Sequence, residues 1–319
     1  MHKVVIAQPI AQEGVQLLER QGFDVNTLER CSPDALLQNV GDADGLLVRD
    51  AIVTREVIER GSKLKVISRH GAGLDKIDLA AATERGIVVT YTPIANSLSV
   101  AEHVMAMILA LAKKLLIIDA ATRSNRFDIR HERYGFELGG RTLGILGLGN
   151  VGSRLARTAL FGFGMRVVGY DPFVDRTAFP TEMEWAEDWR AVMLSCDVVS
   201  LHLPLTADTR GMIDIEALRL MKPTALLINC ARGEVVKEAD LVQALRDRVI
   251  AGAGVDVYDP DPPPADHPLF AFDNVIVTPH TAAHTHEAMR NMAVQAAQGI
   301  VEVLSGKVPT WPANQSAKS

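Results

Sequence analysis

The chain has 319 residues, 48% of them hydrophobic and 23% charged, which argues against a disordered or fibrous protein. This length exceeds the usual size of a single core, so we expect two domains. The formal net charge of −6 argues against nucleic acid or an anionic membrane as the main partner.

Cysteine usage and the amino terminus indicate the compartment. Cys31, Cys196 and Cys230 are too few and too scattered for a disulfide framework or a zinc site. The first residues lead straight into an apolar run and lack the regions of a signal peptide. We therefore expect a cytoplasmic protein.

Short apolar runs alternate with amphipathic stretches, which is the pattern of parallel, doubly wound α/β sheets. In the first part of the chain we expect strands near residues 4–7, 24–28, 45–49, 64–69 and 87–91. A single long helix is expected over about 99–119, and its most apolar stretch, 104–112, is too short to span a bilayer.

A glycine-rich turn follows that helix, between a predicted strand and a predicted amphipathic helix. Gly147, Gly149 and Gly152 match the G-x-G-x-x-G pattern of dinucleotide-binding βαβ units. Gly147 would allow the tight turn, Gly149 would let a pyrophosphate approach the backbone, and Gly152 would let the helix pack on the strand. Asp171 ends the next apolar run, where a carboxylate accepts hydrogen bonds from a ribose 2′-hydroxyl and repels a 2′-phosphate. The pattern therefore predicts NAD rather than NADP, and a turn without a ligand is the alternative.

The second half contains further predicted strands that end in polar groups. They lie near residues 198–203, 225–230, 251–257 and 274–278, and a last helix is expected over about 285–304. Because the carboxyl ends of parallel strands meet at one edge of a sheet, we expect Arg232, a carboxylate and His280 to come together there. Residues 259–268 are rich in proline and are predicted to form a stiff loop.

Together these motifs resemble the D-isomer-specific 2-hydroxyacid dehydrogenase family, which includes phosphoglycerate, D-lactate and glyoxylate or hydroxypyruvate enzymes. The matching stretches are residues 68–75, 96–103, the glycine-rich turn, 201–206, 229–233 and 278–280. The resemblance implies a Rossmann-type NAD-binding domain, residues 99–285, inserted into a flavodoxin-like substrate-binding domain, residues 1–98 and 286–319. It also implies a homodimer that forms through the long helix.

The resemblance implies roles for three side chains. Arg232 would hold the substrate carboxylate and polarise the C2 oxygen, and His280 would be the general acid or base. The family has a glutamate beside that histidine, whereas this chain has Asp261, which is one methylene shorter. We predict that Asp261 still pairs with His280, and Asp259 is the second choice.

The resemblance also assigns binding residues. For the cofactor these are Gly147, Gly149, Asn150, Val151, Gly152, Asp171, Pro172, His202, Pro204, Thr209, Cys230, Ala231, Arg232, Asp256 and His280. For the substrate they are Arg49, Arg69, His70, Gly71, Ala72, Gly73, Asn96, Arg232 and His280. No metal is expected, because the loop-like spacing of His280, His284 and His286 comes without clustered carboxylates or thiolates.

Arg49 bears on the identity of the substrate. In phosphoglycerate dehydrogenases an arginine in a similar place meets the substrate phosphate, so we expect a small anionic 2-hydroxy or 2-keto acid, with 3-phosphoglycerate, hydroxypyruvate and glyoxylate as leading candidates. The alternative is that Arg49 simply pairs with Asp50.

Two other functions fit this scaffold. An NAD-sensing, corepressor-like binding protein would share the fold, and turnover of any 2-keto acid would exclude it. A phosphite or formate dehydrogenase is the second alternative. Formate enzymes carry a glutamine beside the histidine, so Asp261 argues against them.

Overall fold

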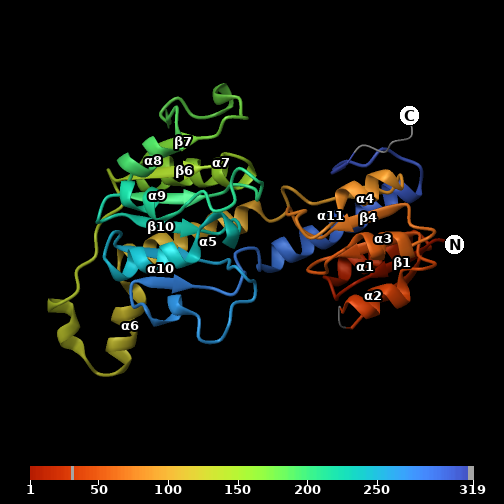
Figure 1. Cartoon of the computed structure of the whole chain (residues 1–319), viewed down its shortest axis with the longest axis horizontal. Coiled ribbons are helices and arrows are strands. Elements are labelled where there is room, and N and C mark those ends of the chain that lie inside the picture. Colours follow the sequence, from red (N-terminus) through yellow and green to blue (C-terminus); the bar gives the residue numbers. More distant parts are fainter. Residues whose placement is uncertain (30–31, 315–319) are drawn as a thin grey trace. The chain divides into compact units, whose positions relative to one another are not determined.

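The computed structural model describes residues 1–29 and 32–314, so Cys31 lies outside the described residues. The chain divides into two compact units. Unit 1 consists of Met1–Asn96 with His284–Ser319, and unit 2 consists of Ser97–Ala283. Figure 1 shows the elements of both units.

Unit 1 contains a five-stranded sheet in the order β2-β1-β3-β4-β5, and all of its strand pairs are parallel. This is the flavodoxin-like order, as expected from the sequence. The inner strands are buried on both faces, which is why they read as continuous apolar runs. The strands are β1 (Lys3–Ile6), β2 (Asp24–Thr27), β3 (Gly45–Val48), β4 (Val66–Arg69) and β5 (Val88–Thr90).

Helices cover both faces of this sheet. α1 and α11 pack on the face that carries Val4 and Ile6, and α2, α3 and α4 pack on the face that carries Val5. Most of these helices begin at a side chain that caps a free backbone N–H. Thr285, for example, accepts a hydrogen bond from Ala288 N at the start of α11. The helices are α1 (Gln12–Arg20), α2 (Pro33–Asn39), α3 (Arg55–Arg60), α4 (Leu79–Glu84) and α11 (His286–Leu304).

Unit 2 contains a seven-stranded parallel sheet in the order β12-β11-β10-β9-β6-β7-β8. Counted from β6, this is the Rossmann order with one further strand, so the predicted fold class is confirmed. The order reverses between β6 and β9, and ligands of such sheets bind at that point. The strands are β6 (Thr142–Leu146), β7 (Arg166–Tyr170), β8 (Glu184–Trp185), β9 (Val198–Leu201), β10 (Leu226–Asn229), β11 (Gly252–Val255) and β12 (Val275–Val277).

Two hydrophobic clusters fill the two faces of the second sheet. α8, α9 and α10 pack on one face, and α5 and α7 pack on the other. The α-helices are α5 (Ser97–Ala112), α6 (Leu115–Arg123), α7 (Asn150–Arg157), α8 (Trp189–Ser195), α9 (Ile215–Leu220) and α10 (Glu238–Arg246). Shorter helical turns are η1 (Phe127–His131), η2 (Thr158–Gly162), η3 (Arg176–Ala178), η4 (Gly233–Val235) and η5 (Pro268–Ala271).

The single helix expected over residues 99–119 is two helices. α5 ends at Ala112, and Lys114 adopts a left-handed conformation with φ of 52° before α6 begins. The carbonyl oxygen of Ala112 accepts a hydrogen bond from Phe136 N at 2.9 Å instead of continuing the helical ladder. As a result, α6 and η1 project from the rest of unit 2 (Figure 1).

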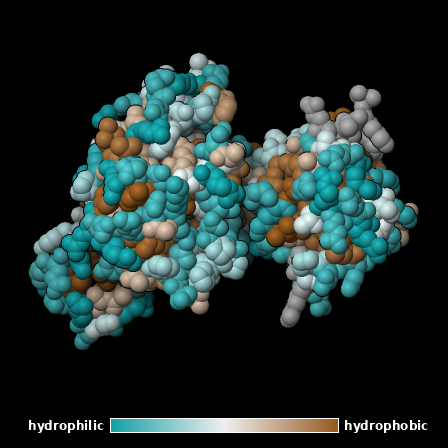
Figure 2. Space-filling view, viewed as in Figure 1, coloured by the Kyte–Doolittle hydropathy of each residue, from teal (hydrophilic) through white to brown (hydrophobic). Residues whose placement is uncertain are grey.

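The surface of each unit is mixed in character. Figure 2 shows hydrophilic residues over most of the visible face, with smaller hydrophobic groups between them. Within residues 1–29 and 32–314, no helix has the length and apolar character needed to cross a bilayer.

Candidate active site

The three glycines of the turn after β6 meet different surroundings. Gly147 has a φ of 93°, and a Cβ there would lie 2.6 Å from the carbonyl oxygen of His202. A Cβ on Gly152 would lie 2.1 Å from the carbonyl oxygen of Gly147. A Cβ on Gly149 would meet no atom within 4 Å. Protein packing therefore explains Gly147 and Gly152, whereas the open space at Gly149 fits the approach of a pyrophosphate to the backbone.

Asp171 is held beside the same turn. Its Oδ2 accepts a hydrogen bond from Leu148 N at 2.8 Å, and its Oδ1 accepts one from Phe173 N at 2.9 Å. Each carboxylate oxygen keeps a further lone pair, so the oriented carboxylate can accept hydrogen bonds from ribose hydroxyls. Pro172, which follows it, supplies no positive charge for a 2′-phosphate. These residues fit NAD.

A second predicted cofactor segment follows strand β9. Burial lowers the pKa of His202 to about 4, so the ring is neutral, and its Nε2 lies 2.9 Å from Ser200 Oγ. Thr209 Oγ1 donates a hydrogen bond to the carbonyl oxygen of Pro204 at 2.6 Å. This bond closes the loop that follows β9.

His280 and Asp261 are in direct contact. His280 follows β12, Asp261 lies in the loop after β11, and Nδ1 of the ring is 2.5 Å from Asp261 Oδ2. The expected pair is therefore present, although the aspartate is one methylene shorter than a glutamate. Asp259 instead has an exposed side chain, and its backbone N–H donates a hydrogen bond to Glu238 Oε2. With Nδ1 engaged, Nε2 is the ring nitrogen available for proton exchange.

A buried carboxylate fixes the turn that carries His280. Asp256 is 1% exposed, and its Oδ1 accepts hydrogen bonds from Thr278 Oγ1 at 2.5 Å and from Thr281 N at 2.8 Å. Its Oδ2 accepts another from Ala282 N at 3.0 Å. These bonds hold the backbone on both sides of His280, whose φ of 56° is uncommon for a residue other than glycine. Besides its predicted cofactor role, Asp256 therefore anchors the turn that carries His280.

His103, Cys230 and Asp256 lie close enough together to suggest a metal site, with ligand atoms within 4.8 Å of one another. The hydrogen bonds give another explanation. Thr278 donates its hydroxyl proton to Asp256, so its oxygen accepts from Nε2–H of His103, which lies 3.1 Å away. That nitrogen then has no lone pair for a metal, and burial raises the pKa of the Cys230 thiol well above its ordinary value. The sequence motifs that contain His103 and Thr278 did not indicate these roles, because the roles depend on contacts between distant segments.

Arg232 lies at the same edge of the sheet as His280. The registers pair Asn229 with Val255 and Val255 with Val277, so the carboxyl ends of β10, β11 and β12 are level. Asn229 shapes the turn before the arginine, accepting a hydrogen bond from Ala231 N and donating one to the carbonyl oxygen of Arg232. The arginine of this turn, the proline loop and the histidine turn thus follow three adjacent strands.

In unit 1 the predicted substrate loop follows β4. Gly71 N donates to Thr92 Oγ1 at 2.9 Å, and the Arg69 guanidinium donates to the carbonyl oxygens of His70 and Gly73. Arg69 therefore holds its own loop in shape. The backbone N–H groups of Ala72 and Gly73 have no acceptor within the part of the chain that the structure describes. They can serve as donors to an anion. Asn96, half-buried, ends this part of unit 1.

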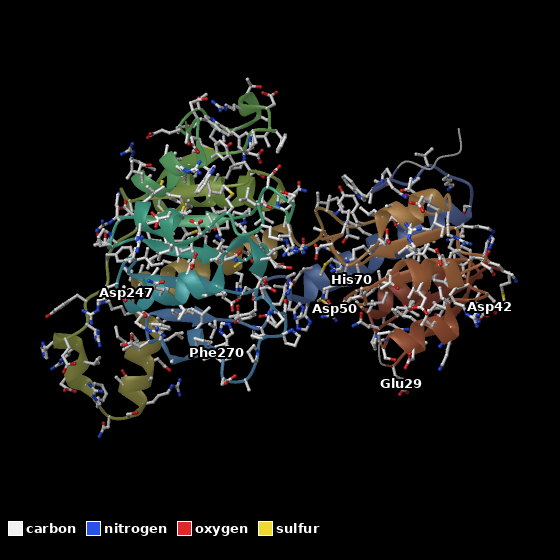
Figure 3. All side chains as sticks on the ribbon, in the orientation of Figure 1. Glu29, Asp42, Asp50, His70, Asp247 and Phe270 are labelled. Atoms are coloured by element: carbon white, nitrogen blue, oxygen red, sulfur yellow. The ribbon has the colours of Figure 1, made fainter. Side chains whose placement is uncertain are left out.

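Arg49 follows β3 and makes two contacts. Its Nε lies 3.4 Å from Asp50 Oδ2, and its Nη2 lies 3.1 Å from Nε2 of His284. His70 is buried nearby, and burial, followed by the charges of Arg49 and Arg69, lowers its pKa to about 4. Nε2 of His70 has no hydrogen-bond partner among the described residues. Figure 3 labels Asp50 and His70. The contact of His284 with Arg49 was not predicted.

Residues 105–282 match the model of the family described as D-isomer specific 2-hydroxyacid dehydrogenase, NAD binding domain. The chain belongs to the D-isomer specific 2-hydroxyacid dehydrogenase family. The match confirms the resemblance that the motifs indicated, and it supports NAD as the cofactor.

Individual relatives agree with this result. The chain is 40% identical over 310 residues to a D-3-phosphoglycerate dehydrogenase of Methanocaldococcus jannaschii, covering 97% of this chain but 58% of that protein. It therefore spans less than two thirds of that relative. A glyoxylate reductase of Thermofilum pendens is 39% identical over 321 residues, covering 96% of this chain and 93% of the relative.

Among solved structures, the TT0316 protein of Thermus thermophilus superposes with a TM-score of 0.90 at 35% identity, covering 98% of this chain and all of that one. The curated relatives are named as dehydrogenases and reductases, which does not favour the corepressor-like alternative.

Proposed function

We propose that this protein is an NAD-dependent dehydrogenase that interconverts a small D-2-hydroxy acid and the corresponding 2-keto acid. The contact between Asp261 and His280 carries this proposal, because it places an oriented acid–base group at the sheet edge that also bears Arg232. We assign NAD binding to unit 2 and part of the substrate binding to unit 1.

Side chains of this protein can exchange the hydroxyl proton of the substrate and bind its carboxylate. Bound NAD supplies the acceptor for the hydride that leaves C2 of the hydroxy acid. Nε2 of His280 takes the hydroxyl proton during oxidation and returns it during reduction, and Asp261 stabilises the imidazolium that forms. Arg232 offers a planar fork of N–H donors to the substrate carboxylate. In unit 1, the N–H groups of Ala72 and Gly73 are uncharged donors for an anionic group of the substrate.

Arg49 supports a substrate with a second polar or anionic group. Its contact with Asp50 is a partly exposed ion pair, and such pairs contribute about 0–1 kcal/mol. Its contact with His284 is a single hydrogen bond to an exposed ring. A phosphate or hydroxymethyl group can therefore replace them at little cost. We propose 3-phosphoglycerate, hydroxypyruvate and glyoxylate as the candidate substrates.

The test is a panel of 2-keto acids, assayed with NADH and NADPH by the loss of nicotinamide absorbance. We expect turnover of at least one of the candidates and a preference for NADH. Arg49→Ala should change the ratio of rates on phosphorylated and unphosphorylated substrates. An unchanged ratio would refute the role of Arg49, and no turnover of any 2-keto acid would refute the dehydrogenase.

We further propose a homodimer that forms through α6, the second half of the stretch expected as one long helix, and through the segment that follows it up to Tyr134. Leu115, Leu116, Phe127 and Tyr134 on this segment are each more than half exposed. A cavity of about 880 Å³ lies beside it and is lined partly by Ile117 and Phe272. A second copy would cover this apolar surface. Light scattering should give a dimer at micromolar concentration, and a monomer would refute the interface.

The cytoplasm remains our proposed location. Cys196 and Cys230 are free thiols, which a reducing compartment preserves.

A further inference from the structure

We propose that Glu238 and His267 form a clamp that positions Asp261 against His280. This inference rests on the proposed function, because Asp261 acts through His280 in the reaction. Neither residue of the clamp has a role in the motifs described above. Both act as positioning residues.

His267 is a buried residue at the far end of the proline loop, with 5% of its surface exposed. Its Nδ1 accepts a hydrogen bond from Leu269 N, so the ring proton is on Nε2. Nε2 contacts Oε1 of Glu238, the first residue of α10. Because Nδ1 accepts a hydrogen bond and Nε2 carries the proton, His267 donates a hydrogen bond from Nε2 to the carboxylate of Glu238.

The second oxygen of Glu238 holds the near end of the same loop. Oε2 accepts a hydrogen bond from Asp259 N at 3.2 Å. One carboxylate therefore fastens both Asp259 and His267, and Asp261 lies between these two points. Four of the residues between them are prolines, which have no N–H to donate to a neighbouring strand. Few other hydrogen bonds are available to fix this segment.

Aromatic packing connects the clamp to the turn that carries His280. Tyr258 is buried, and its ring centroid lies 5.7 Å from that of His267. Its hydroxyl donates a hydrogen bond to the carbonyl oxygen of Thr278 at 2.9 Å, two residues before His280. Phe270, labelled in Figure 3, packs against His267 with a centroid separation of 5.3 Å. The loop that carries Asp261 and the turn that carries His280 are thus both held by the packed side chains of Glu238, His267 and Tyr258.

The short side chain of Asp261 makes this positioning important. An aspartate reaches His280 only if its backbone lies close to the ring, and its side chain is 30% exposed, so surrounding packing restrains it weakly. Displacement by about 1 Å at a reacting group can lower a rate by about 100-fold. We therefore expect the clamp to affect kcat rather than binding.

The test compares Glu238→Ala with a control, Glu216→Ala, in the full-length protein. Glu216 is an exposed residue in the first turn of α9, and its side chain contacts Arg219. We expect Glu238→Ala to lower kcat by about 10- to 100-fold, with KM for the 2-keto acid and the Kd for NADH changed less than about twofold. Glu216→Ala should leave all three unchanged.

A double-variant comparison separates positioning from a general loss of structure. In an Asp261→Asn background, Glu238→Ala should lower kcat by less than about twofold further, because the contact that the clamp serves is already lost. A full additional loss in that background, or a loss confined to KM or NADH affinity, would overturn the proposal.

A substrate-free readout distinguishes the clamp from the proposed function. In proton NMR, the hydrogen bond between His280 and Asp261 should give a low-field Nδ1 proton that Asp261→Asn removes. Loss of that signal in Glu238→Ala but not in Glu216→Ala would support the clamp even if no 2-keto acid is turned over. Its persistence in Glu238→Ala, or its absence from the unsubstituted protein, would overturn the clamp.

Discussion

At the scale of single residues, the reach of a side chain depends on the backbone that carries it. Asp261 contacts His280 at 2.5 Å although it is shorter than the glutamate that the family has there. The contact requires the proline loop to hold the backbone of Asp261 close to the ring. The sequence predicted the pair, but it did not indicate the side chains that hold it, Glu238 and His267.

Asp261→Asn should lower kcat by about 100-fold, because the amide keeps the shape of the side chain but cannot stabilise an imidazolium with a negative charge. The control is Asp259→Asn, two residues away, whose side chain is exposed and which we expect to retain full activity. Steady-state kinetics of the two variants measure this difference in kcat. Equal effects of the two substitutions would contradict the assignment of Asp261.

The burial of His70 predicts a stability that depends on pH. Its pKa falls from 6.5 to about 4 in the folded protein, mainly because of burial and then because of the charge of Arg49. The unfolded chain therefore binds a proton below about pH 6.5 that the folded chain does not bind until about pH 4. The free energy of unfolding should decrease as the pH falls through this range, by up to about 3 kcal/mol from this residue.

Urea unfolding at pH 7 and pH 4.5 measures this effect. His70→Asn should lose less stability between the two pH values than the unsubstituted protein, since the asparagine does not titrate. Equal losses of stability in the two proteins would show that His70 does not cause the pH dependence.

At the scale of elements, the turn after β6 contains one glycine that packing requires and another that leaves space for a ligand. Gly152 is required because a Cβ would lie 2.1 Å from a carbonyl oxygen, whereas Gly149 faces open space. Local sequence predicted both glycines because the motif is contiguous. It did not predict the break between α5 and α6, because Phe136, which takes the carbonyl oxygen of Ala112, is far away in the sequence.

Alanine substitutions at these two glycines should have opposite effects. Gly149→Ala should melt within about 2 °C of the unsubstituted protein but bind NADH at least about tenfold more weakly, because the methyl group fills the space for the pyrophosphate. Gly152→Ala should melt at a clearly lower temperature, because the helix must move away from the strand. Thermal melting and a fluorescence titration with NADH report the two properties. Weak NADH binding with a lowered melting temperature in Gly149→Ala would contradict this division.

At the scale of the whole molecule, each unit has its own hydrophobic core. Two clusters of buried side chains lie within unit 1 and two within unit 2, and none of the four described clusters draws residues from both. The chain passes between the units at residues 96–97 and 283–284. Each unit therefore has the separate hydrophobic core that a domain needs in order to fold on its own.

A fragment of residues 97–283 should fold cooperatively and bind NADH. Circular dichroism during thermal melting and NADH fluorescence are the measurements, and the same fragment with Gly149→Ala is the control for specific binding. An unfolded fragment would show that unit 2 depends on unit 1 for its stability.

Features that arise from neighbours along the chain could be predicted before any coordinates. Apolar runs with regular spacing predicted the two parallel sheets, and a contiguous glycine motif followed by Asp171 predicted NAD. The three-dimensional contacts were needed to show where α5 ends, why Asp256 is buried beside the His280 turn, and which carboxylate holds the proline loop. These features depend on hydrogen bonds between residues that are distant in sequence, and folding brings such residues together in ways that no local pattern records.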